Sequence, residues 1–255
     1  MKLRSLITRP QNKGELLAAE IKAAGGQAIC CPFIEVTAGG QFNLVPQYLN
    51  NLTTQDYIIA ISDNAVNYST QSLQQQNYSW PQTVNYIAVG PNTAQSWQRA
   101  GVTSAQIPLT HDSEGVLALL QDLDLTHSRI IILRGNGGRE TLAEALIQRS
   151  KNVTYCEVYQ RIKPNYDHNK LVDNWQQFAI NSVIITSGEI LTNLMHSIPS
   201  YASPWITNLY FIVPSQRIAK LAYQFGINHV TIAQGASNDA ILAALEQLDM
   251  QIGIS

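Results

Sequence analysis

The chain has 255 residues, 45% of them hydrophobic, and this length fits one large domain or two small domains with a sizeable buried core. Lys and Arg total 16 against 18 Asp and Glu, so no overall positive field exists to attract nucleic acid or an anionic membrane surface, and a bound anion must be held by local features. The apolar runs fall far short of the ~20 residues that cross a bilayer, and the first residues show no secretory signal, so we expect a cytoplasmic protein that contacts neither membranes nor nucleic acid.

Short apolar strands alternate with amphipathic helices along the chain, a pattern typical of βαβ units and a mostly parallel sheet. A strand is predicted over residues 3–8 and a helix over residues 15–24, which Gly25 and Gly26 terminate. The apolar face expected for this helix consists of Leu16, Leu17, Ile21 and Ala24. Extended segments at 27–36 and 153–162 are each followed by a polar, turn-rich stretch, so we interpret them as the two crossings between two lobes.

An internal repeat supports two lobes. Residues 57–66 are echoed by residues 182–191, and each segment contains a strand that ends in a serine before a helix. A second strand and helix follow each copy at the same interval of 28 positions, measured from Ser62 to Gly90 and from Ser187 to Ser215. The simplest interpretation is that both lobes share one ancestral plan.

These patterns predict a fold of two similar three-layer α/β lobes with mostly parallel sheets, joined by a two-stranded β hinge. One lobe is inserted, at residues 37–154, and the other is discontinuous, at residues 1–36 and 163–255. Ligands of α/β sheets lie beyond the carboxyl ends of the strands, and the space between two lobes is a natural place for one.

The cysteines and histidines do not predict a metal or redox site. Three cysteines without CxxC spacing are too few for a disulfide framework, and the five histidines lack the spacing of helical metal ligands. We therefore expect buried structural thiols and no metal. If the two crossings pair as an antiparallel ladder, Cys30 or Cys31 should lie near Cys156.

Hydroxyl groups, glycines and arginines recur where the predicted strands end. Helix N-termini with free N–H groups, close backbone approach at glycine and the fork of arginine together describe a polyanion site. Single Ser, Thr or Asn residues before a helix are also ordinary N-caps, so each one alone fits a structural role. The strand-end loops are residues 8–10, 62–64, 90–93, 134–139, 186–188 and 215–217.

Motifs for nucleotide binding and covalent catalysis are not found. The loop 134–139 is neither a Walker A loop nor a spaced G-x-G-x-x-G fingerprint, and no nucleophile elbow or H-E-x-x-H motif occurs. What remains is electrostatic positioning with help from a phenol near the crossings, Tyr155 or Tyr159, although a strand tyrosine is more often a packing residue.

Six short motifs are spread over essentially the whole chain. They are Ile7-Thr8-Arg9-Pro10, Ser62-x-Asn64-Ala65-Val66, Ala88-Val89-Gly90-Pro91-x-Thr93-Ala94, Leu133-Arg134-Gly135 with Gly138-Arg139, Val158-Tyr159, and Thr186-Ser187. In order and spacing, these motifs resemble the uroporphyrinogen-III synthase family. The resemblance implies a dehydrating cyclisation of hydroxymethylbilane to uroporphyrinogen III with inversion of ring D, in heme and siroheme biosynthesis, without a cofactor.

The resemblance also implies site residues and partners. Tyr159 is expected to assist departure of the substrate hydroxyl, and the partners are the linear tetrapyrrole and, transiently, hydroxymethylbilane synthase. The expected substrate-binding residues are Arg9, Ser62, Asn64, Thr93, Arg134, Gly135, Gly138, Arg139, Ser187, Gly188 and Ser215.

The sequence departs from the family pattern in several places. Ile61 stands where threonine is frequent, and Asp63 adds an acid beside Ser62. Ile218 cannot supply a hydroxyl contact, for which Ser215 is the substitute. The competing interpretations are a non-enzymatic two-lobed protein that clamps a polyanion with the same loops, and a nucleotide-dependent transferase.

Overall fold

A computed structural model describes residues 2–137, 140–150 and 152–253 of the chain. Residue contacts divide the chain into two units. Unit 1 comprises residues 1–35 and 162–255, and unit 2 comprises residues 36–161. Within the described ranges, no helix combines the length and the apolarity needed to cross a membrane.

Unit 1 is built on a parallel five-stranded sheet with the strand order β10-β9-β8-β1-β2. The first strand along the chain therefore lies in the interior of the sheet, between its sequence neighbour β2 and the distant β8. The strands are β1 (Arg4–Ile7), β2 (Gln27–Cys30), β8 (Ser182–Ile184), β9 (Tyr210–Val213) and β10 (His229–Ile232).

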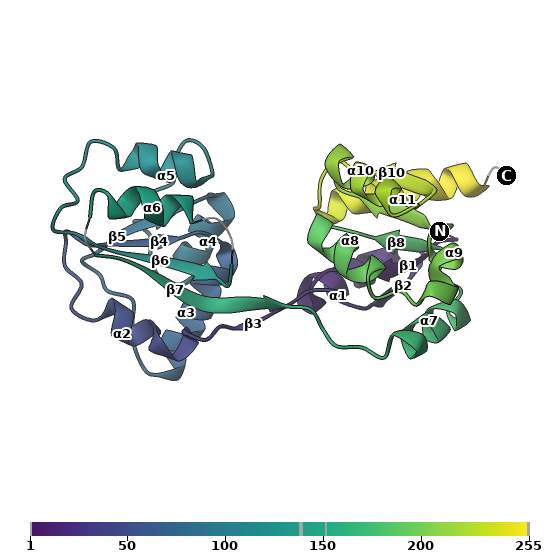
Figure 1. The fold of residues 1–255 in the computed structure, drawn as a ribbon, viewed down its shortest axis with the longest axis horizontal. Coiled ribbons are helices and arrows are strands. Elements are labelled where there is room, and N and C mark those ends of the chain that lie inside the picture. Colours follow the sequence, from purple (N-terminus) through teal and green to yellow (C-terminus); the bar gives the residue numbers. More distant parts are fainter. Residues whose placement is uncertain (1, 138–139, 151, 254–255) are drawn as a thin grey trace. The chain divides into compact units, whose positions relative to one another are not determined.

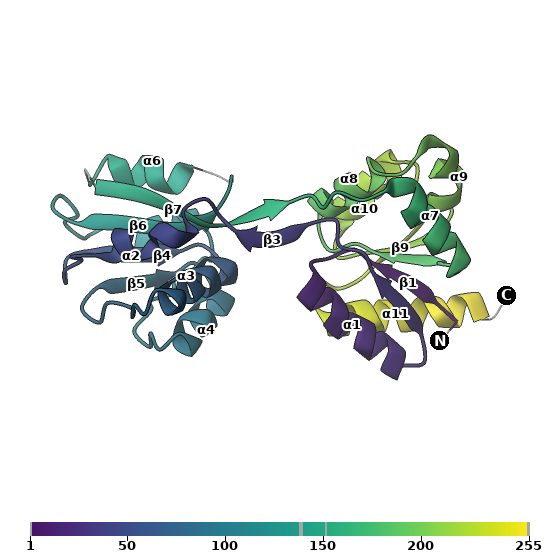
Figure 2. The ribbon, with the colours of Figure 1, turned by 90° about the horizontal axis from the view of Figure 1, so that it is seen from below.

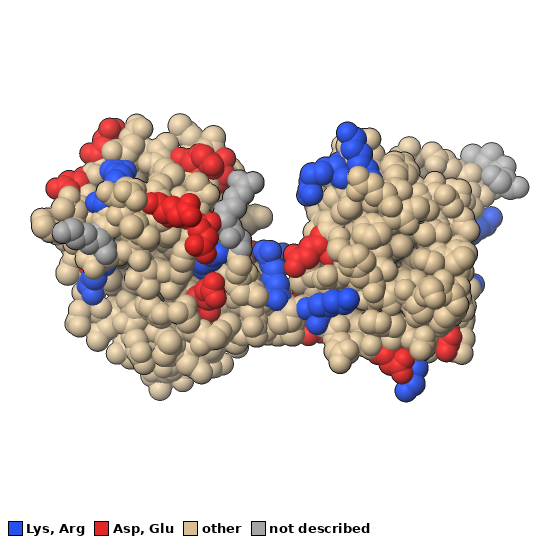
Figure 3. Space-filling view, in the orientation of Figure 1, with Lys and Arg blue, Asp and Glu red and all other residues tan. Residues whose placement is uncertain are grey.

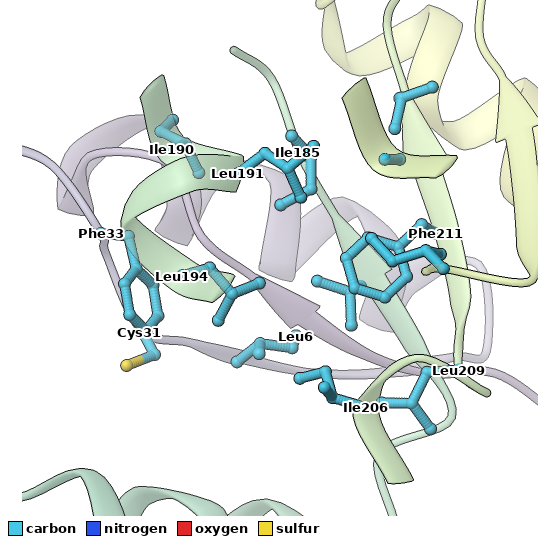
Figure 4. Close-up of a cluster of buried hydrophobic side chains, with 14 of the residues drawn as sticks. Leu6, Cys31, Phe33, Ile185, Ile190, Leu191, Leu194, Ile206, Leu209 and Phe211 are labelled. Atoms are coloured by element: carbon cyan, nitrogen blue, oxygen red, sulfur yellow. The ribbon is translucent and has the colours of Figure 1, made fainter. Parts of the chain in front are cut away.

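Helices cover both faces of this sheet (Figures 1 and 2). They are α1 (Gln11–Ala23), α7 (His168–Gln177), α8 (Gly188–Met195), α9 (Ser203–Ile206), α10 (Gln216–Gln224) and α11 (Asn238–Gly253), with a 3-10 turn at Ser200–Ala202. On one face Leu6 and Phe211 of the strands pack with Leu191 and Leu194 of α8 (Figure 4). On the other face, the next residue along β1, Ile7, packs with α1 and α11. Alternating apolar residues of each strand thus fill two cores, as expected for a parallel sheet buried on both sides.

Unit 2 repeats this architecture with the strand order β3-β7-β6-β4-β5, and the pairings of β5 with β4, β4 with β6 and β6 with β7 are parallel. The strands at the two ends of the unit, β3 and β7, are neighbours in the sheet. The strands are β3 (Glu35–Ala38), β4 (Tyr57–Ala60), β5 (Asn85–Ala88), β6 (Arg129–Gly135) and β7 (Asn152–Ile162).

The helices of unit 2 again form two outer layers (Figures 1 and 2). One core joins Ile58 of β4 to α2, α3 and α4, and the other joins Ile59 to α5 and α6. The helices are α2 (Val45–Leu49), α3 (Asp63–Gln75), α4 (Pro91–Arg99), α5 (Ser113–Leu119) and α6 (Thr141–Ile147), with a 3-10 turn at Phe42–Leu44. The expected fold class, α/β with mostly parallel sheets, is confirmed.

Strand register confirms the internal repeat. In unit 2 Ala60 pairs with Ala88, and in unit 1 Ile184 pairs with Ile212. The two intervals are identical, and each of the four strands leads through an extended residue into a helix: Ser62, Gly90, Ser187 and Ser215.

The expectation for the first helix is partly wrong. Leu16 is expected on the buried face of the first helix, but its side chain is 64% exposed. The helix begins earlier than expected, and Gly14, Leu17 and Ile21 face inward. A Cβ atom at Gly14 would lie 3.4 Å from Arg9 and Cys30 and 3.5 Å from Ile7, so this face of the helix lies close to the sheet.

The pairing expected between Cys30 or Cys31 and Cys156 is also wrong. Gln27–Cys30 does not belong to a ladder with β7, because it pairs with β1 in unit 1. Cys31 lies in a core of unit 1 and Cys156 in a core of unit 2. Burial raises the pKa of both thiols to about 12, so both remain protonated structural side chains.

Candidate functional site

The expected site residues lie at the carboxyl-end edges of the two sheets. Because neighbouring strands in each unit run parallel, the loops that follow them emerge at one edge. In unit 2 these are the loops after β4, β5 and β6, and in unit 1 they are the loops after β1, β8 and β9. Helices begin directly after four of these strands, so free backbone N–H groups accumulate at each edge.

Three expected residues of unit 2 come together: Ser62, Gly135 and Tyr159. The Ser62 hydroxyl donates a hydrogen bond to the Tyr159 phenol oxygen, with 3.1 Å between the oxygens. A Cβ atom on Gly135 would lie 2.5 Å from two carbons of the Tyr159 ring, so the ring rests on the glycine backbone. Tyr159 is 3% exposed, so its ring is in the core. Ser62 is half-buried, so the phenol hydroxyl that contacts it lies at the strand-end edge.

A β-bulge turns Tyr159 toward Ser62. The register between β6 and β7 shifts by one residue, with Val158 as the extra residue before Tyr159 pairs with Gly135. Simple alternation would place Tyr159 on the same face as Tyr155, which packs against the α5 and α6 core. The bulge instead places Tyr159 beside Val158 in the core under α3.

Two residues that support Tyr159 were not anticipated. Tyr68 of α3 stacks on the Tyr159 ring, with the centroids 6.0 Å apart, and its hydroxyl donates to the Val36 carbonyl oxygen at 2.6 Å. Burial raises the pKa of Tyr68, which keeps this donor protonated. Gly39 donates its N–H to the Val158 carbonyl oxygen at 3.0 Å, and any side chain there would clash with the β7 backbone. In the sequence, the pair Gly39-Gly40 could have indicated a close backbone approach. The contact between Tyr68 and Tyr159 could not have been predicted, because it forms only when α3 packs on the sheet.

Arg134 supports its own loop. Its side chain is 2% exposed, and it donates from Nε to the Gly135 carbonyl oxygen at 3.1 Å and from Nη2 to the Gly137 carbonyl oxygen. The guanidinium carbon lies 4.2 Å from the centre of the Tyr155 ring. Burial raises the pKa of Tyr155, and the positive charge of Arg134 opposes that rise. These contacts use two of the guanidinium nitrogens within the protein, so the role of Arg134 in binding a substrate stays a prediction.

A pocket of about 220 Å³ lies beside Arg134 on the α5 and α6 side of the sheet. Asp112 also lines it, and its carboxylate accepts hydrogen bonds from the Gly115 N–H and the Thr110 hydroxyl. A cation and an anion therefore share this pocket, which makes it a poor receptor for a carboxylate alone. The other lining residues are Ile61, Val89, Ser113, Ile132, Leu142 and Tyr155.

The remaining expected residues of unit 2 lie in the first turns of helices. Asn64 is the second residue of α3 and is half-buried, and Thr93 is the third residue of α4 and is buried. Since β4 and β5 are adjacent and in register, these two helix starts are neighbours at the strand-end edge. Gly138 and Arg139, which are expected to bind substrate, lie outside the described residues.

In unit 1 the expected residues share one edge. The Ser187 hydroxyl caps α8 by accepting from the Ile190 N–H at 3.2 Å, and Gly188 is the first residue of that helix. Ser215 precedes α10 in the same extended conformation, without a side-chain bond to the helix. In the described part of the chain, the Ser215 hydroxyl is therefore not used as a helix cap.

Arg9 is engaged within unit 1. It is 5% exposed, and its Nη2 donates to Oδ1 of Asn238 at 2.5 Å. Asn238 in turn donates to Glu20 at 2.8 Å, so the polar chain joins the loop after β1 to α11 and α1. Burial lowers the pKa of Arg9, and the Glu20 carboxylate opposes that shift. Its Nε is buried without a hydrogen-bond partner among the described residues.

The charge distribution favours local recognition of anions. Acidic and basic side chains are interspersed on the face drawn in Figure 3, and most of that surface is uncharged. The described residues contain no group of three or more His, Cys, Asp and Glu side chains arranged to hold a metal ion. With a formal net charge of −2, the chain would have to bind a polyanion through local donors, such as the hydroxyl and backbone N–H groups at the strand-end edges.

Comparisons with known proteins identify the family of the chain. A family model described as uroporphyrinogen-III synthase HemD matches residues 15–243. Uroporphyrinogen-III synthases of Salmonella typhimurium and of Escherichia coli K12 are each 35% identical to the chain over 243 residues, which cover 94% of this chain and 99% of the relative.

Solved structures show the same fold at low sequence identity. A crystal structure of a mutant uroporphyrinogen III synthase from the extreme thermophile Thermus thermophilus matches with a TM-score of 0.61 and 13% identity, covering 99% of this chain and 100% of that chain. The uroporphyrinogen-III synthetase of Helicobacter pylori 26695 matches with a TM-score of 0.56 and 14% identity, covering 97% and 100%.

Proposed function

This chain belongs to the uroporphyrinogen-III synthase family, and on that premise we propose that it closes hydroxymethylbilane into uroporphyrinogen III with inversion of the last pyrrole ring. The observation that carries the proposal is 35% identity to curated uroporphyrinogen-III synthases over 94% of this chain. Such a lyase-type cyclisation removes water from the substrate, and we propose that it needs no cofactor.

The chemistry requires a departing hydroxyl and a controlled ring closure. When the terminal hydroxyl of the bilane takes up a proton and leaves as water, the adjacent pyrrole nitrogen supplies the electron pair, which gives an electrophilic azafulvene cation. The substituted carbon of the last ring attacks the methylene carbon of this cation and forms a spiro intermediate. Its rearrangement inverts the last ring, and loss of a proton restores the pyrrole. Because unaided closure gives the uninverted isomer, the enzyme must mainly select one geometry by binding energy.

We assign the proton donor to Tyr159. A phenol hydroxyl is able to act as a general acid. The contact with Ser62 supports this assignment, because it brings the phenol oxygen of a buried ring to the strand-end edge. The bulge in β7 supports it further, since the chain departs from regular pairing at the residue before this side chain.

The substrate carboxylates would be held by donors at the two strand-end edges. In unit 2 we propose the first turns of α3 and α4, with Asn64 and Thr93. In unit 1 we propose Ser187, Gly188 and Ser215, where two helices begin side by side after paired strands. Helix N-termini carry partial positive charge and unpaired N–H groups, so they are able to bind carboxylates even where the protein surface is not basic.

Isomer analysis of the product tests this function. Freshly made hydroxymethylbilane is incubated with the protein, without metal or nucleotide and with a chelator in a parallel sample, and the oxidised porphyrins are separated. We expect isomer III to replace isomer I in both samples, with heat-unfolded protein yielding isomer I. Folded protein that binds the bilane and leaves the output as isomer I would identify a binding protein instead. Loss of isomer III only with chelator would overturn cofactor independence alone.

A further inference from the structure

The direction of the hydrogen bond between Ser62 and Tyr159 determines which donor and acceptor positions of each hydroxyl remain unused. A hydroxyl has one hydrogen and two acceptor positions. The Ser62 oxygen accepts from the Ala65 N–H at 3.2 Å and donates its hydrogen to the Tyr159 oxygen at 3.1 Å. Ser62 therefore has no hydrogen remaining for a substrate carboxylate.

The Tyr159 hydroxyl, by contrast, uses only its oxygen in the contacts of the described residues. Its oxygen accepts from Ser62, and within the described part of the chain its own hydrogen has no acceptor. Stacking on Tyr68 and contact with Gly135 hold the ring, so the hydroxyl cannot swing to another partner without moving the core. The Tyr159 phenol is thus held in place, and its hydrogen remains available for donation.

We propose that Ser62 is a positioning residue for Tyr159 and not a ligand of the substrate. By occupying an acceptor position of the phenol oxygen, Ser62 restricts the directions in which the phenol hydrogen is able to point. Ser62 also caps α3, a helix of 13 residues, so the positive end of the helix dipole lies beside the same oxygen. Negative charge that develops on this oxygen as the proton leaves is then stabilised by a preorganised donor. This inference rests on the proposed function and on the role given there to Tyr159.

The internal repeat allows the positioning of Tyr159 by Ser62 to be distinguished from helix capping. Ser187 has nearly the same backbone conformation as Ser62, with φ and ψ of −152° and 159° against −160° and 162°, and it caps α8 through Ile190. Among the described residues, a hydroxyl bond to a phenol is found for Ser62 and not for Ser187. The contact with Tyr159 is therefore an addition to the shared plan of the two units.

Variants of Ser62 and Tyr159 test the proposal in the isomer assay. In Ser62→Ala we expect kcat to fall about 10-fold, a part of the 10²- to 10⁴-fold that general acid help typically supplies. KM should change less than about twofold and the product should remain isomer III, because substrate binding is retained. Ser62→Thr keeps the hydroxyl and should restore most of kcat. In a Tyr159→Phe background, Ser62→Ala should lower kcat no further, since the group that it positions is gone.

Ser237→Ala is the matched control. The Ser237 oxygen accepts from the Ala240 N–H at 3.3 Å at the start of α11, so this variant also removes a serine cap without reaching Tyr159. It should lower Tm about as much as Ser62→Ala and keep kcat. If Ser62→Ala does not fold, Ser62→Gly removes the same hydroxyl with a residue that helix starts tolerate.

Three outcomes would overturn the inference. A raised KM with unchanged kcat would make Ser62 a substrate ligand. An equal loss of kcat in the parent and in Tyr159→Phe would show that Ser62 acts independently of the phenol. Unchanged kinetics in Ser62→Ala would reduce the residue to a helix cap. Failure of the parent protein to form isomer III is a separate result, which would overturn the proposed function itself.

Discussion

Tyr159 places an apolar ring against Tyr68, with the centroids 6.0 Å apart, and a polar hydroxyl against Ser62. Removing the hydroxyl leaves the ring, its stacking and its contact with Gly135 in place. The catalytic and packing contributions of this residue are therefore separable by one substitution.

We predict that Tyr159→Phe lowers kcat by about 10- to 10³-fold, because general acid help is lost while water partly replaces it. Tm should change little and the product should remain isomer III. The comparison needs kcat, Tm and isomer ratio in one buffer.

Tyr86→Phe is the matched control for that variant. Tyr86 is also 3% exposed in the same core, and its hydroxyl donates to the Pro81 carbonyl oxygen at 2.7 Å. It should keep kcat and lose some stability. If Tyr159→Phe has the same profile as Tyr86→Phe, the Tyr159 hydroxyl has only a structural role.

Residue types at the strand ends were predictable, but their partners were not. The sequence places serines, glycines and arginines after the strands, and the structure finds them there. Yet an arginine that binds a carboxylate and one that binds a neighbouring carbonyl have the same appearance in a sequence. Arg134 bonds to its own loop and Arg9 to Asn238, a partner 229 positions away. Such a partner is identified only once the chain is folded.

At the scale of the element, β7 combines a predictable strand with an unpredictable bulge. The expected extended segment, 153–162, agrees closely with Asn152–Ile162. Counting alternate residues along it would put Tyr159 on the face of Tyr155. The extra residue, Val158, reverses that assignment, and it is fixed by Gly135 of β6 and by Gly39, which follows β3.

We predict that Gly135→Ala lowers kcat at least as much as Tyr159→Phe, because the new methyl group would lie 2.5 Å from two ring carbons and must displace the ring. Overpacking of this kind costs about 1–3 kcal/mol of stability. Urea unfolding and kcat are the measurements.

Gly40→Ala serves as the control, since a Cβ atom there has no described heavy atom within 4 Å. Its activity and stability should be close to those of the parent protein. Normal kcat in folded Gly135→Ala would show that the ring relaxes without losing its function, and the positioning role of β6 would be wrong.

At the scale of the molecule, each unit has two cores of its own, one on each face of its sheet. Ile59 is fully buried in unit 2 and Ile184 is fully buried in unit 1. Replacing either with alanine removes comparable apolar volume from separate cores, which makes the two variants controls for each other.

We predict that Ile59→Ala, at a cost of about 2–5 kcal/mol, speeds amide hydrogen exchange in β4 and β5 and leaves β8 and β9 protected. Ile184→Ala should give the reverse pattern. Exchange followed by mass spectrometry of peptides resolves the two units. Equal loss of protection in both units from either variant would mean that they unfold as one.

The interior position of β1 has a consequence for synthesis on the ribosome. Ser5 of β1 hydrogen-bonds to Ser182 of β8, 177 positions later. At about 5–20 residues per second, the nascent strand waits roughly 9–35 s for that neighbour, and all of unit 2 is translated in the interval. During this time the apolar residues of β1 and α1 are without most of their core. A chain stalled in this interval exposes these residues to chaperones and proteases. Unit 1 is therefore the unit that is more susceptible to recognition by cellular quality control during synthesis.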